Sequence, residues 1–309
     1  MGTATLVLPV FAVIVTGWLT GAFGYLPRAL SAPLVQFAYN VAMPALVFLT
    51  VAREPIGALL DWRFLGAFGG GSVVCFAAVF LAAQAFGRRG VGSRAMLGAA
   101  ATMTNTGFVA LPLLQALYGD RGVLPAAIAT VFVAVVTFPA LIGLLEIDGR
   151  RDGHSGRISP AMLARRVVVN PVMISTLLGL AWSVAGLPLP STVAAYAGIF
   201  AEALTPCALF SIGLGLSFEG LRGGISTLVA LAALKLLAVP LVVYGLCLAL
   251  GLGPFLTVSA VVCAAVPTAK TAYVLAGEYQ VEGTVVAATV SVTTLLSVIT
   301  LLGWLYLLG

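Results

Sequence analysis

Residues 101–119 read ATMTNTGFVALPLLQALYG, an apolar run in which the polar Asn105 precedes Pro112 by about two helical turns. Proline removes a backbone donor from a helix, so this run predicts a membrane helix that is broken rather than straight. A second run, residues 263–279, reads CAAVPTAKTAYVLAGEY, and Pro267 interrupts it in the same way. These two segments decide the expected fold, because helices broken in this manner mark the binding sites of membrane carriers built from repeats.

Apolar runs long enough to cross a bilayer continue on both sides of these segments. The chain has 309 residues, of which 61% are hydrophobic and 8% are charged, and its mean hydropathy is +1.15. A soluble domain carries about 25% charged residues, and a helix needs about 20 apolar residues to cross the ~30 Å hydrocarbon core. The composition therefore predicts one continuous integral membrane domain and excludes a water-soluble one.

Charges, prolines and glycines divide the apolar sequence into about ten transmembrane helices of an all-α fold. The helices are expected near residues 4–25, 33–51, 63–86, 95–117, 122–145, 167–186, 191–217, 225–250, 254–278 and 283–308. The polar stretch 146–166 is expected to be a solvated loop. The cysteines all lie inside apolar runs, where a thiol behaves as a small hydrophobe, so no disulfide, metal site or cofactor is expected.

Arginine is distributed unevenly over the expected loops. Ten arginines fall on the side opposite the N-terminus and three on the same side as the N-terminus. They are Arg28, Arg88, Arg89, Arg94, Arg150, Arg151, Arg157, Arg165, Arg166 and Arg222, against Arg53, Arg63 and Arg121. Loops rich in lysine and arginine stay in the cytoplasm. We therefore expect the loop 146–166 in the cytoplasm and both termini outside it; the net charge of +5 reflects this topology rather than nucleic-acid binding.

Several residues recur at a fixed offset of 162 positions. In the first and sixth expected helices the pairs are Pro9 and Pro171, Gly17 and Gly179, and Gly24 and Gly186. In the second and seventh expected helices, Asn40 and Pro44 match Glu202 and Pro206 at the same offset. A register kept over two helices indicates an internal repeat.

The repeat predicts the organisation of the chain. Each half holds five expected spans, an odd number, so the second half must enter the membrane in the opposite orientation. We expect a first repeat over residues 1–145, the cytoplasmic loop over 146–166, and a second, inverted repeat over 167–309. Folds of this kind place their substrate near the middle of the bilayer, on helices interrupted by proline or glycine.

The two interrupted runs supply the candidates for substrate binding. The N-terminus of a half-helix offers free N–H groups and partial positive charge to an anion. The candidates are Asn105, Thr106, Pro112, Pro267, Thr268, Lys270 and Thr271. For each kind of residue, an interpretation without substrate binding also stays open. A proline can merely kink a helix, Asn105 can hold helices together through a hydrogen bond, and the side chain of Lys270 can extend toward a membrane interface.

Three further polar residues inside expected spans are candidates for coupling transport to an ion: Glu202, Lys235 and Asn40. A charge at the centre of a membrane helix costs ~2.5–3.5 kcal/mol on insertion scales, so a chain that keeps one is expected to use it. A carboxylic acid in a low dielectric prefers its neutral form, which suits Glu202 to exchanging a proton. The alternatives are that Glu202 lines a pore near the outer face and only pairs with a lysine, and that Lys235 only binds a backbone carbonyl and holds the helices together.

Segments along the whole chain together resemble the auxin efflux carrier family, which includes plant exporters and bacterial permeases for malonate, malate and similar acids. They are FAYNVAMPALVF (37–48), TNTGFVALPLL (104–114), NPVMISTLLGL (170–180), PCALFSIGLGL (206–216) and AAVPTAKTAYVLAGEY (264–279). The resemblance implies ten helices in two inverted repeats, with the fourth and ninth crossing at proline breaks beside the substrate. It also implies a transport part that moves against a scaffold. The chain departs from the plant exporters in its short central loop and in a third helix that lacks their Asp and Lys.

From this resemblance we expect a secondary transporter, not an enzyme, for small organic anions such as malonate, malate or auxin-like carboxylates. Its partners are the organic anion, the lipid bilayer and a coupling ion, with H⁺ preferred over Na⁺; a homodimer is left open, and nucleic acid is not expected. Two alternatives remain: a sodium-coupled symporter resembling the bile-acid family, and a membrane receptor or channel that does not carry its ligand.

Overall fold

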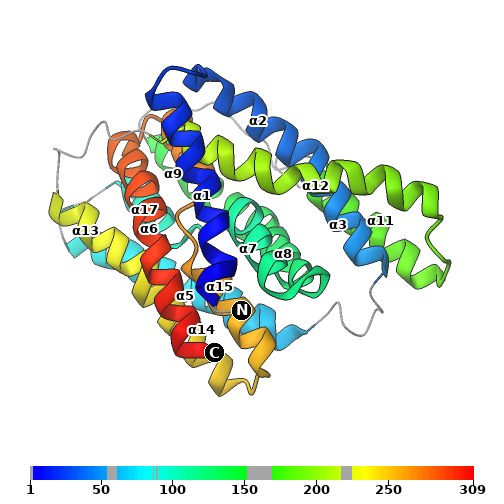
Figure 1. Cartoon of the computed structure of the whole chain (residues 1–309). Coiled ribbons are helices and arrows are strands. Elements are labelled where there is room, and N and C mark those ends of the chain that lie inside the picture. Colours follow the sequence, from blue (N-terminus) through cyan, green and yellow to red (C-terminus); the bar gives the residue numbers. More distant parts are fainter. Residues whose placement is uncertain (1–2, 54–60, 86, 88–89, 152–168, 217–224) are drawn as a thin grey trace. The chain divides into compact units, whose positions relative to one another are not determined.

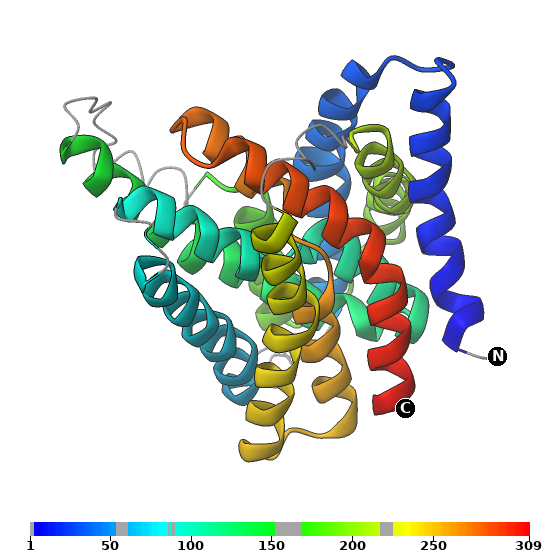
Figure 2. The same cartoon turned by 90° about the vertical axis from the view of Figure 1, so that its left-hand side faces the viewer.

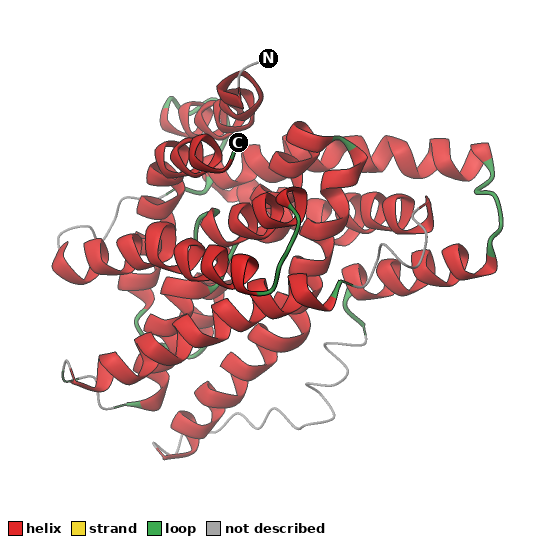
Figure 3. Ribbon diagram, turned by 90° about the horizontal axis from the view of Figure 1, so that it is seen from below, coloured by secondary structure: helices red, strands yellow, loops and turns green. Residues whose placement is uncertain are grey.

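The structure is a computed structural model of the chain (Figure 1). It describes residues 3–53, 61–85, 87, 90–151, 169–216 and 225–309. Within these ranges every regular element is helical (Figure 3), which confirms the all-α prediction. Seven of the described helical segments are long and apolar enough to cross a membrane, and three shorter apolar helices accompany them.

The described helices follow the apolar runs. In the first half they are α1 (Thr3–Ala22), η1 (Arg28–Leu30), α2 (Ser31–Phe37), η2 (Ala38–Ala42), α3 (Met43–Arg53), α5 (Trp62–Ala85), α6 (Val91–Thr102), η3 (Thr106–Ala110), α7 (Leu111–Tyr118), α8 (Asp120–Phe132), η4 (Val133–Thr137) and α9 (Phe138–Arg151). In the second half they are α11 (Pro171–Ala185), α12 (Ser191–Leu214), α13 (Ile225–Ala233), η5 (Leu234–Ala238), α14 (Val239–Ala249), α15 (Pro254–Ala265), α16 (Lys270–Glu278) and α17 (Gly283–Leu308). That these segments form ten spans in two inverted repeats stays a prediction.

The polar stretch 146–166 begins as helix rather than as loop. α9 continues through residues 146–151 of this stretch. The acidic side chains there have partners within the fold: Glu146 accepts a hydrogen bond from Tyr279 Oη (2.8 Å), and Asp148 accepts one from the N–H of Val91, the first residue of α6 (2.8 Å). The expectation of a solvated loop is therefore wrong for this part, and residues 152–166 lie outside the described residues. Also outside are Arg88, Arg89, Arg157, Arg165, Arg166 and Arg222.

Short π-helical segments interrupt several of the long helices, and each ends two residues before a proline. They are η2 before Pro44, η3 before Pro112, η4 before Pro139 and η5 before Pro240. Proline has no N–H, so the carbonyl one turn earlier loses its donor, and a wider turn lets the backbone bond around the gap. These prolines are thereby accommodated without ending the helix.

The chain divides into two compact units. Unit 1 comprises Met1–Trp62, Gly107–Val131 and Arg166–Leu216, and unit 2 comprises Arg63–Thr106, Phe132–Arg165 and Ser217–Gly309. Each unit takes segments from both predicted halves of the chain, so the compact units cut across the predicted repeat boundary.

In unit 1, α1 packs along α12, and α3 packs along α11. Glycine permits the first of these approaches, because a Cβ at Gly17 would collide with the backbone carbonyl of Phe210 and one at Gly213 with that of Ile14. Close backbone approach at small residues is the usual way in which membrane helices associate. Gly17 belongs to the repeated pattern of the sequence, so part of that pattern serves helix packing.

The core of unit 2 is built from α6, α9, α16 and α17, with apolar side chains of α5 packed against it. α6 contributes small buried residues, and its Gly98 lies against the ring of Phe76. α17 also packs along α13 and η5 (Figure 2). The ends of α6 and α15 are buried, and they bring two interrupted helices into the interior of this unit.

Candidate functional site

Two broken helices meet in unit 2. α6 and α15 both end with extended backbone, and the chain becomes helical again at Thr106, where η3 begins, and at Lys270, where α16 begins. Between these ends, Thr104 and Thr268 face each other as an antiparallel β-bridge. A bridge of this kind lets each break satisfy backbone groups of the other, which a buried backbone requires.

A pair of backbone hydrogen bonds joins the two breaks. The N–H of Asn105 donates to the carbonyl of Pro267 (3.0 Å), and the N–H of Ala269 donates to the carbonyl of Met103 (2.9 Å). The bonds lie on either side of the bridge. We call this arrangement the crossover, meaning residues 103–105 and 266–269.

The first break is not where the sequence predicts it. Pro112 lies inside α7, and the π-turn η3 before it absorbs its missing donor. The chain leaves the helix earlier, after the N–H of Met103, because the carbonyl of Met103 and the N–H of Asn105 bond to the second break instead of to their own helix. The predicted break at Pro112 is therefore wrong in position, whereas Pro267 lies within the second break, between α15 and α16.

Thr268 holds the crossover together. Its hydroxyl donates to the carbonyl of Ala100 (2.7 Å), its N–H donates to Thr293 Oγ1 (3.1 Å), and only 1% of the residue is exposed. Both donors are engaged within unit 2. Thr268 was expected among the substrate contacts, but this arrangement leaves it no donor to offer and makes it a structural residue of the site.

Two side chains at the crossover have unused polar groups. Asn105 is 7% exposed, and its carboxamide forms no hydrogen bond with any described residue. The hydroxyl of Thr104 is buried and likewise has no partner in the described part of the chain. A buried polar group without a partner, such as the Thr104 hydroxyl, costs about 1–3 kcal/mol, whereas the carboxamide of Asn105 is not among the fully buried atoms and remains accessible to a ligand. Sequence reasoning selected Asn105 and Thr106 but missed Thr104, since nothing in the sequence distinguishes it from the nearby Thr102.

The remaining predicted binding residues lie at or near the helix starts. Thr106 is 2% exposed and opens η3. Lys270 is the first residue of α16, it is half-buried, and Thr271 beside it is exposed. Ala269 provides no side-chain cap for α16. An uncapped helix start of this kind presents partial positive charge together with the lysine ammonium.

Lys235 lies in η5 and is completely buried. Its Nζ donates to the carbonyl of Ala264 (2.5 Å), in the last turn of α15, and it forms no ion pair with a carboxylate of the described residues. Lys235 therefore binds a backbone carbonyl, as its simpler interpretation expects, and its role in coupling stays a prediction. The other coupling candidates belong to unit 1, where Asn40 is exposed on η2.

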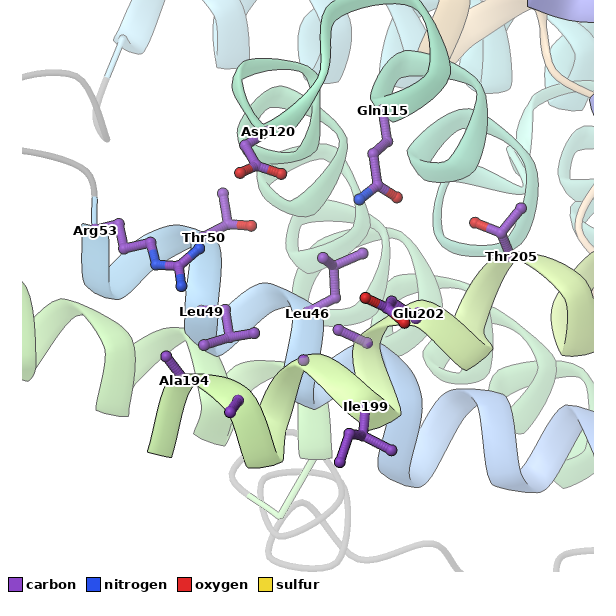
Figure 4. A pocket seen from close by; sticks show the side chains of 13 residues that line it. Leu46, Leu49, Thr50, Arg53, Gln115, Asp120, Ala194, Ile199, Glu202 and Thr205 are labelled. Atoms are coloured by element: carbon purple, nitrogen blue, oxygen red, sulfur yellow. The ribbon is translucent and has the colours of Figure 1, made fainter. Parts of the chain in front are cut away.

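Unit 1 contains a cavity of about 660 Å³ between α3, α7, α8 and α12 (Figure 4). Its polar lining consists of Thr50, Arg53, Gln115, Asp120, Glu202 and Thr205. The guanidinium of Arg53 and the carboxylates of Asp120 and Glu202 surround one hollow from three different elements, and no ion pair joins them in the described structure. Glu202 is exposed there, although it lies near the middle of α12. A charge at this depth is tolerated when it faces a water-filled space.

The comparison with known proteins decides the family. Residues 3–305 match the family described as membrane transport protein. The chain belongs to this family.

Several known transporters are similar to the chain. A protein of Rhizobium meliloti (strain 1021), named "Putative malonate transporter", is 30% identical over 307 residues, which cover 98% of this chain and 95% of the relative. An uncharacterized transporter of Methanothermobacter thermautotrophicus is 26% identical over 313 residues, covering 98% of both chains. Auxin efflux carrier component 3a of Oryza sativa subsp. japonica is 32% identical over 158 residues, 49% of this chain and 26% of the plant protein.

Membership of the membrane transport protein family confirms the resemblance inferred from the sequence. Together with the apolar helices, it makes the chain a multi-pass membrane transporter. The family is one of transporters, in keeping with the expectation that the chain is not an enzyme.

Proposed function

We propose that this protein is a secondary transporter of small organic anions, with malonate and malate as the first substrates to test and auxin-like carboxylates as the wider class. The observation that carries the proposal is the crossover of unit 2, where two broken helices meet beside an unused carboxamide at Asn105. The substrate class is supported by the relative of Rhizobium meliloti, whose name cites malonate and which aligns over 98% of this chain.

An anion is the ligand that suits the crossover best. Asn105 supplies amide donors, and α16 adds an uncapped helix start with Lys270 as its first residue. Partial positive charge at a helix N-terminus and a lysine ammonium both favour a carboxylate. In our proposal the substrate carboxylate lies near Asn105 and Lys270, with Thr106 and Thr271 next to them and Thr268 as the structural support.

The membrane arrangement belongs to the same proposal. We place ten spans in two inverted repeats, both termini outside the cytoplasm and the protein in a bacterial inner membrane, on the evidence of the sequence repeat and of the arginine distribution. In the alternating-access cycle, unit 2 is the moving part, since it holds the crossover.

Energy constrains the direction of transport. Moving one charge across 100 mV costs about 2.3 kcal/mol, so importing a dianion against roughly 150 mV costs ~7 kcal/mol. Export of the same dianion runs downhill, and import needs cations that enter with it. We propose protons as these cations, with Glu202 as the acid that exchanges them, because its carboxylate lines the cavity of unit 1 at mid-helix depth.

Uptake into proteoliposomes tests the proposal. The purified protein is reconstituted, and accumulation of labelled malonate and of malate is measured with a pH gradient, with a sodium gradient, and with neither. We expect accumulation driven by the pH gradient, at least tenfold weaker in Asn105→Ala and Lys270→Ala. The exposed Gln36→Ala on α2 is the matched control and transports normally. Counterflow of labelled substrate separates a carrier from a receptor, and lack of transport of both acids contradicts the proposed substrates.

A further inference from the structure

The two segments of the crossover, residues 103–105 and 266–269, are related by a local two-fold axis. One hydrogen bond, from Lys235, departs from this symmetry. Its backbone hydrogen bonds come as a matched pair around the bridge of Thr104 and Thr268. Ala100 lies four residues before one bridge threonine, and Ala264 lies four residues before the other. The two alanines therefore occupy corresponding places, each in the last turn of the helix that ends at its break.

The hydroxyl groups of the two threonines differ in their partners. Thr268 Oγ1 donates to the carbonyl of Ala100 (2.7 Å), and the two-fold relation assigns the matching bond to Thr104 Oγ1 and the carbonyl of Ala264. The ammonium of Lys235 occupies that carbonyl instead. As a result, the hydroxyl of Thr104 is one of the few buried polar side-chain atoms without a partner in the described structure.

The end of α15 is a place that attracts positive charge. Within an α-helix the carbonyls of Cys263 and Ala264 would accept from the N–H groups four residues on, at Pro267 and Thr268. Pro267 has no N–H, and the N–H of Thr268 is used by Thr293. Carbonyls without helical donors carry the negative end of the helix dipole. In transporters built from inverted repeats, such carbonyls at half-helix ends coordinate the coupling cation.

We propose that Lys235 is a built-in cation: its ammonium fills the cation position at the end of α15, so the crossover needs no sodium ion. A fully buried lysine without a carboxylate partner among the described residues is costly, and the helix-end carbonyl offsets part of that cost. This inference rests on the proposed carrier function but not on the choice of substrate. It predicts that removing the ammonium opens a site for a small monovalent cation, with Thr104 as one ligand.

Thermal unfolding of the detergent-solubilised full chain tests the inference without any substrate. Midpoints are compared in NaCl and in choline chloride at equal ionic strength. We expect equal midpoints for the wild type and for Lys235→Arg, and a midpoint several degrees higher in NaCl for Lys235→Ala, because an ion that binds only the folded state stabilises it. A sodium-specific rise in the wild type, or no sodium effect in Lys235→Ala, overturns the proposal.

A double variant identifies the second ligand. We expect Thr104→Ala alone to behave like the wild type, and Lys235→Ala with Thr104→Ala to lose most of the sodium effect. If Lys235→Ala folds only when purified in NaCl and unfolds on exchange into choline chloride, the proposal is supported. If Lys235→Ala and Lys235→Gln both unfold in either salt, the lysine is needed for more than its charge and the proposal fails. Loss of malonate transport alone leaves this result untouched and counts against the substrate only.

Discussion

Thr104 and Thr268 face each other in one antiparallel bridge, yet among the described residues only Thr268 has a partner for its hydroxyl group. The two residues thus have the same local backbone pairing and opposite hydrogen-bonding states. This contrast provides a matched pair of substitutions within one site.

Replacing Thr268 by valine is expected to destabilise the protein, and replacing Thr104 by valine is not. Thr268→Val leaves the buried carbonyl of Ala100 without its donor, at a cost of about 1–3 kcal/mol. Thr104→Val removes a buried hydroxyl that has no partner in the described structure, which is neutral or stabilising by up to ~1 kcal/mol. Thermal unfolding in detergent measures both. Equal losses of stability in the two variants would contradict the assigned hydrogen bonds.

Asn105→Ala is expected to abolish substrate binding without lowering stability. The carboxamide of Asn105 has no partner in the described part of the chain, so its removal breaks no bond of the fold. The readout is the rise in unfolding midpoint that malonate produces, since a ligand that binds the folded state stabilises it. We expect this rise in the wild type and in Gln36→Ala but not in Asn105→Ala. A lower midpoint for Asn105→Ala without ligand would show that Asn105 holds helices together.

A cysteine at position 202 is expected to react with a charged, membrane-impermeant thiol reagent. Glu202 lines the cavity of unit 1 and is exposed there, whereas Leu204 on the same helix is completely buried. In a background with the native cysteines replaced, Glu202→Cys should be labelled at least ten times faster than Leu204→Cys. Comparable slow labelling of both variants would mean that water does not reach this depth.

Gly17→Ala is expected to weaken the packing of α1 on α12. The new Cβ would collide with the backbone carbonyl of Phe210, and a backbone carbonyl can move aside only with its helix. Overpacking of this kind costs about 1–3 kcal/mol. Gly198→Ala is the control on α12, because its Cβ would meet no described atom within 4 Å. We expect Gly198→Ala to keep or raise the unfolding midpoint. A normal midpoint for Gly17→Ala would contradict this helix contact.

The positions of the helices could be predicted from the sequence, because long apolar runs between charges have few alternatives in a bilayer. The position of the first break could not. A proline inside a membrane helix can end the helix or be absorbed by a wider turn, and here η3 absorbs Pro112 while backbone bonds to the second break, from Asn105 to Pro267 and from Ala269 to Met103, place the break earlier. The second break was predictable because Pro267 lies in the break itself.

The cavity in unit 1 could be predicted only in part. Glu202 stands out as an acid inside an expected span, whereas Arg53 and Asp120 come from separate parts of the chain and lie at expected helix ends or loops, where charges are common. In the sequence, Arg53 bears only on the predicted orientation of the chain in the membrane. The unused hydroxyl of Thr104 was equally hidden, since it follows from which partner the carbonyl of Ala264 takes.

The segments of the two units alternate along the chain, which affects the order in which the units can be completed during synthesis. Unit 1 needs segments up to Leu216, and unit 2 needs the chain through Gly309, so neither is complete when the N-terminal half leaves the ribosome. The carbonyl of Ala100, in the last turn of α6, receives its hydrogen bond from Thr268, which follows it by more than half the length of the chain. The two units are therefore completed late in synthesis, and we expect a product truncated before Thr268 to leave the carbonyl of Ala100 without this donor inside the membrane.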